Sequence, residues 1–444
     1  MTMIAPNPYL SGNYAPIPDE VTITDLETVG AVPDALTGRY LRTGPNPMAA
    51  PHEPHHWFLG DGMIHGIELR GGKATGYRNR WVRTDAIARA LGETPVGGPA
   101  QPMFDSSNTN IVEFNGQILS LTEGCYPYIM SKELATLKRF DGGTLPRGMT
   151  AHPKIDPRRN ELVGFSYGYV APFLYFHTVD AQGTVTKTEP IDIERPVSMH
   201  DFAMTENYVL FFDQPYVFDL EAAKTQGFPF RWAPEFGARV GVMPRAGTNA
   251  DVKWFESDTC YTFHPMNAFE TADGKIVVDV PKVTNLGGEM APTTDRGSLE
   301  RWTMDLAGGT LTADVVDPCG QEFCRINETL LGTEHRYGYT ISAFNDGPMP
   351  YDSTTIFKHD FTSRTRTDHN FGAHRHPGEF VFVGDPDRAG AEDGGWMMGL
   401  VTNEAENRTD LVILDAQNFG GDPVATVKLP RRVPYGFHGN WVAD

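Results

Sequence analysis

Cysteine, positive charge and long apolar runs are all scarce in this sequence. Its 444 residues include only four cysteines, and their spacing matches neither a common zinc motif nor a disulfide framework: Cys125, Cys260, Cys319 and Cys324. We therefore expect unpaired thiols in a reducing compartment. Acidic residues outnumber basic ones and give a formal net charge of -20. This charge argues against nucleic acid or an anionic membrane as a partner, because either would require a basic surface.

Membrane-spanning and secretory segments are missing as well. No stretch approaches the run of about 20 apolar residues that a membrane helix needs. The first 20 residues have neither the basic region nor the apolar region of a signal peptide. These absences together predict a cytoplasmic protein. No pattern in the sequence specifies an oligomeric state.

Helical periodicity is scarce, and short strands joined by tight turns take its place. The clearest hairpin joins 111–114 to 117–121 through Asn115-Gly116. Similar turns are expected at Gly71-Gly72, Gln182-Gly183, Asp273-Gly274 and Gly420-Gly421. Only 85–91 and 220–225 suggest short helices, as insertions between strands. Evenly spaced hairpins without a linker predict one all-β domain over residues 1–444, and this pattern leaves a propeller and a large barrel both open.

Four of the 14 histidines have similar neighbours, which are small, apolar or turn-forming: His152, His200, His264 and His438. This setting predicts imidazoles at strand ends that face inward, where they are good ligands for iron or zinc. The last of the four lies in an aromatic and glycine-rich tail, 433–441, whose composition suits a packed interior. However, a lone histidine is more often a core residue, and separations of 48, 64 and 174 residues match no compact metal motif. The residues alone therefore leave both interpretations open.

The histidine segments resemble those of the carotenoid cleavage oxygenase family. They read Ala-His-Pro-Lys-Ile-Asp-Pro, His-Asp-Phe-Ala-Met-Thr-Glu-Asn, Phe-His-Pro-Met-Asn-Ala-Phe-Glu and Pro-Tyr-Gly-Phe-His-Gly. With Gly38-Arg-Tyr-Leu-Arg-Thr-Gly-Pro-Asn-Pro and Phe58-Leu-Gly-Asp-Gly-Met-Ile-His, the resemblance covers nearly the whole chain. It implies a seven-bladed β-propeller whose four histidines hold Fe(II) on the axis, with helical and loop insertions that cap the top face.

The same resemblance assigns partners to three of the histidines. It implies that Glu123 faces His200, that Glu322 faces His264, and that Glu379 faces His438. Such a carboxylate accepts a hydrogen bond from the ring nitrogen that points away from the metal, and it thereby fixes the tautomer. The other clustered histidines are expected to be loop or supporting residues: His52, His55, His56, His374 and His376. His65 is expected to pack beside the site.

Two threonines refine the expected chemistry. Thr109 matches a residue that many cleaving members of the family place beside an open metal position, which favours cleavage over isomerisation. Thr122 occupies a position where stilbene-cleaving members carry a lysine that meets a phenolic oxygen. This departure weakens the hypothesis of a lignostilbene-type substrate, and it leaves other phenylpropanoids open.

Aromatic stretches at 167–176 and 208–232 are the expected lining of an apolar substrate tunnel. The predicted substrate contacts are Phe58, Thr122, Phe211, Phe230 and Trp232, although packing in the propeller core explains each aromatic residue equally well. The segment Gly227-Phe-Pro-Phe-Arg-Trp is too irregular for a strand. It predicts a loop that presents an apolar patch to substrate or, transiently, to a membrane.

The implied activity is that of an Fe(II) dioxygenase, which uses O2 to split a carbon–carbon double bond of a carotenoid or apocarotenoid into two carbonyl products. A stilbenoid or phenylpropanoid alkene is the alternative substrate. A non-catalytic apocarotenoid-binding propeller and a zinc esterase are alternatives of a different class. Four histidines would fill a tetrahedral zinc shell and leave no position for water, which argues against the esterase.

Overall fold

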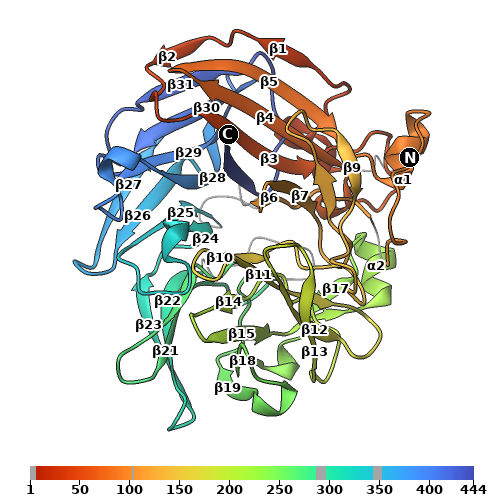
Figure 1. Ribbon diagram of the computed structural model, residues 1–444, viewed down its shortest axis with the longest axis vertical. Helices are drawn as coiled ribbons and strands as arrows, with labels where there is room; N and C mark the ends of the chain where they lie inside the picture. Colours follow the sequence, from red (N-terminus) through yellow and green to blue (C-terminus); the bar gives the residue numbers. More distant parts are fainter. Residues whose placement is uncertain (1–6, 103–104, 287–296, 344–352) are drawn as a thin grey trace, which may run out of the picture.

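Seven antiparallel sheets surround a common axis in the computed structural model (Figure 1). The structure describes residues 7–102, 105–286, 297–343 and 353–444. Residues 1–6 lie outside the described part of the chain. They are the start of the N-terminal stretch in which we expect no signal peptide. The predicted seven-bladed β-propeller is confirmed, and the barrel alternative is wrong.

Each blade is one sheet, and its strands follow one another from the axis outward. The first blade contains β32 (Gly439–Ala443), β3 (Gly38–Pro45), β4 (Gly62–Arg70), β5 (Lys73–Trp81) and β1 (Thr22–Thr24). The second contains β6 (Asn110–Phe114), β7 (Gln117–Leu121), β8 (Tyr128–Met130) and β9 (Thr136–Arg139). The third contains β10 (Lys154–Asp156), β11 (Glu161–Tyr167), β12 (Leu174–Val179) and β13 (Val185–Ile191).

The remaining four blades repeat this order. The fourth contains β14 (Ala203–Met204), β15 (Tyr208–Asp213), β18 (Ala238–Pro244) and β19 (Lys253–Ser257). The fifth contains β20 (Asn267–Glu270), β21 (Ile276–Lys282), β22 (Ser298–Asp305) and β23 (Thr310–Asp317). The sixth contains β24 (Gln321–Arg325), β25 (Tyr337–Ser342), β26 (Thr355–Asp360) and β27 (Thr365–Asn370). The seventh contains β28 (Arg375–Gly384), β29 (Gly395–Asn403), β30 (Arg408–Asp415), β31 (Ala425–Lys428) and β2 (Thr28–Gly30).

The two ends of the chain close the ring. β32, near the C-terminus, pairs with β3 from Gly38↔Ala443 to Arg42↔Gly439 and becomes the innermost strand of the first blade. β2, near the N-terminus, pairs with β31 and completes the seventh blade. The aromatic tail is therefore packed inside the fold, as its composition predicts.

The predicted hairpins are present, and local chemistry explains them. At the turn between β6 and β7, Asn115 and Gly116 have φ angles of 50° and 76°. This left-handed conformation matches the twist of the flanking strands, and Asn-Gly adopts it at little cost. The predicted helices are α1 (Asp85–Ala90) and α2 (Leu220–Gln226), whose first turns are capped by the side chains of Thr84 and Asp219. The four cysteines are free thiols, as expected.

The prediction of a loop at 227–232 is wrong in part. Residues Phe230–Trp232 form β17, which pairs with β16 (Tyr216–Phe218) in a two-stranded ribbon outside the blades. Helix α2 connects these two strands and brings their aromatic side chains into contact, which the irregular sequence does not reveal. Within the part of the chain that the structure covers, no helix is both long and apolar enough to cross a membrane.

Candidate metal centre

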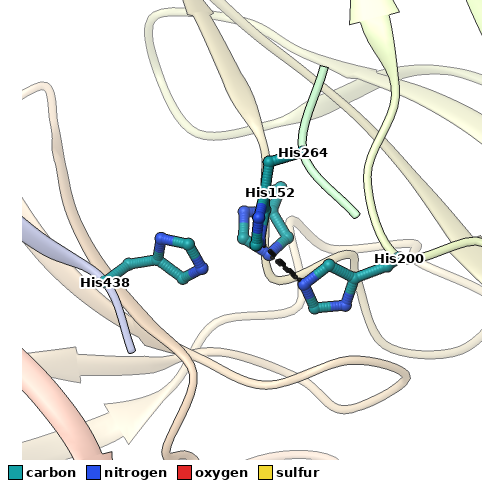
Figure 2. A group of neighbouring side chains, drawn as sticks. All are labelled: His152, His200, His264 and His438. Atoms are coloured by element: carbon teal, nitrogen blue, oxygen red, sulfur yellow. Dashed lines mark hydrogen bonds between the residues drawn. The ribbon is translucent and has the colours of Figure 1, made fainter. Parts of the chain in front are cut away.

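Four histidines converge where the innermost strands begin (Figure 2). His152 precedes β10, His200 precedes β14, His264 precedes β20, and His438 precedes β32. One ring nitrogen of each lies within 4.8 Å of the corresponding atoms of the other three. These residues, far apart in sequence, meet because a propeller brings the inner strand of every blade to the same axis (Figure 1). The predicted positions at strand ends, facing inward, are confirmed.

The other three blades each contribute one glutamate. Nδ1 of His200 is hydrogen-bonded to Glu123, which follows β7, and Nδ1 of His264 is hydrogen-bonded to Glu322 in β24. Nδ1 of His438 lies 2.9 Å from Oε1 of Glu379 in β28. This is the pairing that the family resemblance implies. All seven blades therefore contribute one of these seven residues to the centre.

Backbone irregularities aim two of the glutamates inward. The pairing of β24 with β25 shifts register between Glu322 and Arg325, and Phe323 has a φ of 51°. β28 shifts register around Glu379 in the same way. A bulge of this kind turns the side chains of the strand away from regular alternation, and bulges are common beside functional sites. The backbone N–H of Phe323 also donates to Glu322, which holds that carboxylate in place.

The ring nitrogens that face the axis are arranged as metal ligands. Nε2 of His200 lies 3.1 Å from Nε2 of His152 and 3.0 Å from Nε2 of His264. His200 and His264 direct their Nδ1–H groups to carboxylates, so a neutral ring presents a lone pair at Nε2. Two lone pairs at this distance repel each other unless they share a cation. The four residues therefore fit a divalent metal.

Two of the distances between these nitrogens can be compared with the spacings expected for a shared ion. Nitrogens about 2.1 Å from one ion are about 3.0 Å apart at right angles and about 3.4 Å apart at tetrahedral angles. The observed separations of 3.0 and 3.1 Å fit right angles. Four nitrogens in an octahedral arrangement leave two positions open, whereas a tetrahedral zinc site would be closed.

Burial keeps three of the rings, those of His152, His264 and His438, in the form that binds metal. It lowers the pKa of His152 and of His264 well below the usual range, and repulsion between the neighbouring imidazoles lowers both further. At His200 burial acts in the same direction, but Glu123 outweighs it and the pKa is raised. A metal must therefore compete with a proton most strongly at His200, since only a deprotonated nitrogen is a ligand.

An outer layer of side chains holds the carboxylates. The hydroxyl of Tyr167 donates to Glu123. Nε and Nη2 of Arg325 lie 2.9 and 3.1 Å from the two oxygens of Glu379. Burial would raise the pKa of Glu379, but the charge of Arg325 prevails and lowers it to about 2. Burial raises the pKa of Glu322 to about 8. Sequence reasoning missed the role of Arg325, although its position three residues after Glu322 was a usable signal.

An aromatic cavity opens onto three of the four histidines, His200, His264 and His438. Its lining includes Phe58, Thr109, Thr122 and Phe230 among the predicted site residues. The hydroxyls of Thr109 and Thr122 are 3.3 Å apart, and Ser106 extends this chain of hydroxyls at 3.1 Å from Thr122. Four further aromatic side chains line the cavity and were not predicted as contacts: Trp57, Phe263, Phe323 and Phe437. The last three are adjacent to His264, Glu322 and His438, so the motifs themselves could have indicated them.

Two predicted substrate contacts lie elsewhere. Phe211 is fully buried in the core between the third and fourth blades, where its ring centre is 6.2 Å from that of Phe176. Trp232 packs against the same core and does not line the cavity. The correction has a simple cause: residues alternate between the two faces of a strand, so an aromatic stretch divides between core and cavity.

The remaining histidines serve the fold in different ways. His56 is buried, and its ring stacks at 4.7 Å on Phe228, beside the cavity. His374 is exposed. His65 is buried within the first blade, where Nδ1 lies 2.9 Å from the hydroxyl of Tyr77, and it does not line the cavity.

Comparisons with known proteins agree with this geometry. The family model described as retinal pigment epithelial membrane protein matches residues 14–443. A carotenoid cleavage oxygenase of Mycobacterium tuberculosis is 39% identical over 98% of this chain and 97% of its own length. The chain belongs to the carotenoid cleavage oxygenase family.

Solved structures of this oxygenase family show the same fold. A lignostilbene dioxygenase of Pseudomonas brassicacearum superposes with a TM-score of 0.89 at 27% identity, and the match covers 99% of both chains. A cobalt-substituted apocarotenoid oxygenase of Synechocystis gives a TM-score of 0.85 at 27% identity over 97% of both chains. The structures that resemble this chain therefore include one named for a stilbene and one named for an apocarotenoid, and the latter was solved with a metal.

Proposed function

We propose that this protein is a non-haem Fe(II) dioxygenase that cleaves a carbon–carbon double bond of a carotenoid or apocarotenoid. One O2 supplies the oxygen atoms of the two carbonyl products, so no other oxidant is needed. The observation that carries this proposal is the convergence of four imidazole lone pairs at the end of an aromatic cavity. The family membership and the two named structures support it.

In this proposal the four histidines hold iron through Nε2. Their neutral rings leave the full charge on the ion, and Fe(II), when bound, supplies the binding and reduction of O2. The three glutamates fix the ring orientations through Nδ1. Thr109 lies in the wall of the cavity, where the resemblance places it beside an open metal position.

The cavity supplies substrate binding and no acid or base. Aromatic side chains such as Phe58, Phe230 and Phe437 offer an apolar surface to a polyene and exclude water from it. The hydroxyls of Ser106, Thr122 and Thr109 form one polar strip in this wall. Because both product oxygens come from O2, no side chain has to transfer a proton.

A product assay tests the reaction. The protein is reconstituted with Fe(II) under argon and then exposed to air with β-apocarotenals, intact carotenoids, resveratrol and isoeugenol. Mass spectrometry should detect paired aldehydes or ketones from a polyene only when both iron and O2 are present. Cleavage of resveratrol or isoeugenol alone would instead support the alternative of a phenolic alkene substrate. The similarity to a lignostilbene dioxygenase favours this alternative. Stoichiometric iron without products would contradict the proposed activity.

Replacing Glu322 with glutamine should weaken the centre without destroying it. The amide keeps an oxygen acceptor for Nδ1 of His264 but is a weaker acceptor than a carboxylate, and changes to such partners typically cost about 10- to 100-fold in affinity or activity. Iron affinity and turnover should each decrease by a factor within this range. Glu300→Gln is the matched control, because Glu300 is a similarly buried carboxylate that instead accepts a hydrogen bond from Trp302. Equal iron affinity in the two variants would contradict the role of Glu322.

A further inference from the structure

A second cavity meets the same histidines, and we call it the axial channel. It is lined by His152, His264 and His438 and by residues of the inner strands β6, β10, β24 and β32. These strands surround the centre of the ring (Figure 1). Of the residues that line the aromatic cavity, only His264 and His438 also line this channel. The two spaces are therefore separate and share little more than the candidate metal ligands.

The order of residues along the chain places the two spaces on opposite sides of the histidines. The residues just before the histidines line the aromatic cavity: Ser198, Phe263 and Phe437. The residues just after them line the axial channel: Lys154, Asp201, Met266 and Asn440. Each inner strand runs away from its histidine along the channel. A metal ion at the centre would therefore face substrate on one side and the axial channel on the other.

The axial channel is chemically unlike the aromatic cavity. Its lining carries four carboxylates, Glu113, Asp201, Glu328 and Glu379, and two cations, Lys154 and Arg325. Its internal volume is ≈ 370 Å³, which accommodates several waters at about 30 Å³ each. Glu113 and Glu328 are exposed, and Glu328 also forms an ion pair with Arg325, so the mouth of the channel is open to solvent and carries an excess of negative charge.

These differences decide which route suits a metal ion. A hydrated dication loses favourable hydration in a mostly apolar space, and the aromatic cavity offers only its strip of hydroxyls and the carboxylates of Glu123 and Glu322 to replace it. In the axial channel, water and carboxylate oxygens can replace hydration at each step, and the excess of negative charge raises the local cation concentration. The channel ends at Nε2-bearing rings, so an ion that enters it reaches its ligands directly.

We propose that divalent metal ions reach the four histidines through the axial channel, separately from the substrate cavity. This proposal rests on the proposed metal centre. It assigns to Glu113 and Glu328 the attraction of the cation at the mouth. It also means that metal can enter or exchange while the aromatic cavity is occupied.

Cobalt uptake tests the route without relying on catalysis. Metal-free full-length protein is mixed with Co(II) at low ionic strength, and the visible absorption of the bound ion is followed in a stopped-flow instrument. One variant narrows the mouth, Thr329→Trp, at an exposed residue of the channel lining. A second variant, Glu113→Gln with Glu328→Gln, removes two charges while keeping similar shapes; Glu328→Gln also releases an ion pair with Arg325, as the control variant releases ion pairs with Lys224 and Arg231. The control, Glu221→Gln with Glu235→Gln, removes two exposed charges beside the 228–230 segment of the aromatic cavity.

We expect Thr329→Trp to slow uptake about tenfold, and the paired channel variant to slow it about three- to tenfold, an effect that added salt should reduce. The control should match wild type, and all proteins should finally bind one cobalt ion per chain. Unchanged rates in both channel variants, with full binding, would overturn the route alone. If wild-type protein binds no cobalt, the metal centre itself is wrong, and with it the route.

Discussion

Replacing His264 with alanine is expected to abolish metal binding and alkene cleavage. Its Nε2 lies 3.0 Å from Nε2 of His200, so its removal takes away one corner of the candidate coordination site and strands the buried Glu322. Loss of a residue that only supports a ligand costs about 10- to 100-fold. Loss of a ligand should reduce iron affinity and activity by more than this factor. Iron analysis after reconstitution and the product assay measure the two effects separately.

His177→Ala is the control for this experiment. His177 is fully buried in the third blade, where Nε2 lies 2.9 Å from the hydroxyl of Ser166, away from the candidate ligands. Its replacement should lower stability and leave one iron per chain in the folded protein. An active, iron-loaded His264→Ala variant would contradict the ligand assignment.

Replacing Arg325 with methionine is expected to cause a large decrease in the free energy of unfolding. Arg325 forms two hydrogen bonds to Glu379 and a third, at 2.9 Å, to the carbonyl of Gly439 in the strand that follows His438. Glu379 is only 3% exposed, so without Arg325 its charge is buried and unpaired. Breaking a buried pair in this way typically costs about 3–5 kcal/mol in the free energy of unfolding. Urea denaturation measures this change, and iron content reports whether His438 keeps its orientation.

Arg336→Met provides a matched comparison. Arg336 also makes two hydrogen bonds to one carboxylate, Asp360, at 3.0 and 2.7 Å. Its side chain is 49% exposed, so water screens the pair and its loss should cost less than about 1 kcal/mol. The prediction for Arg325 fails if the two variants lose equal stability.

Much of the fold could be predicted because its signals are local. The Asn115-Gly116 turn requires left-handed backbone at adjacent residues, and the α1 and α2 helices have short amphipathic segments with capping residues. The ribbon of β16 and β17 escaped prediction because its partners are separated by a helix. Evenly spaced hairpins indicated a closed sheet structure, but the count of blades came from the family resemblance.

The site depends on convergence over long distances, which spacing does not encode. The fifth and sixth blades and most of the seventh lie between His264 and His438 in the sequence. Only the family resemblance therefore predicts that these two residues bind the same metal. Arg325 and Tyr167 act on Glu379 and Glu123 through contacts between blades; the position of Arg325 close to Glu322 hints at a role in the site, but its partner Glu379 does not follow from the sequence. Phe211 is a case in which a local pattern misleads. It lies among aromatic residues, as its sequence indicates, but these residues form the core and not the wall of the cavity.

The closure of the ring by β32 sets an order of events during synthesis. His438 and the strand that joins the first blade are synthesised after the other three candidate ligands and the three glutamates, all of which lie upstream. A nascent chain interrupted before this point has neither a closed ring nor a fourth imidazole. Closure of the ring and completion of the four-histidine set therefore depend on the same segment, and only a chain translated through β32 can complete both.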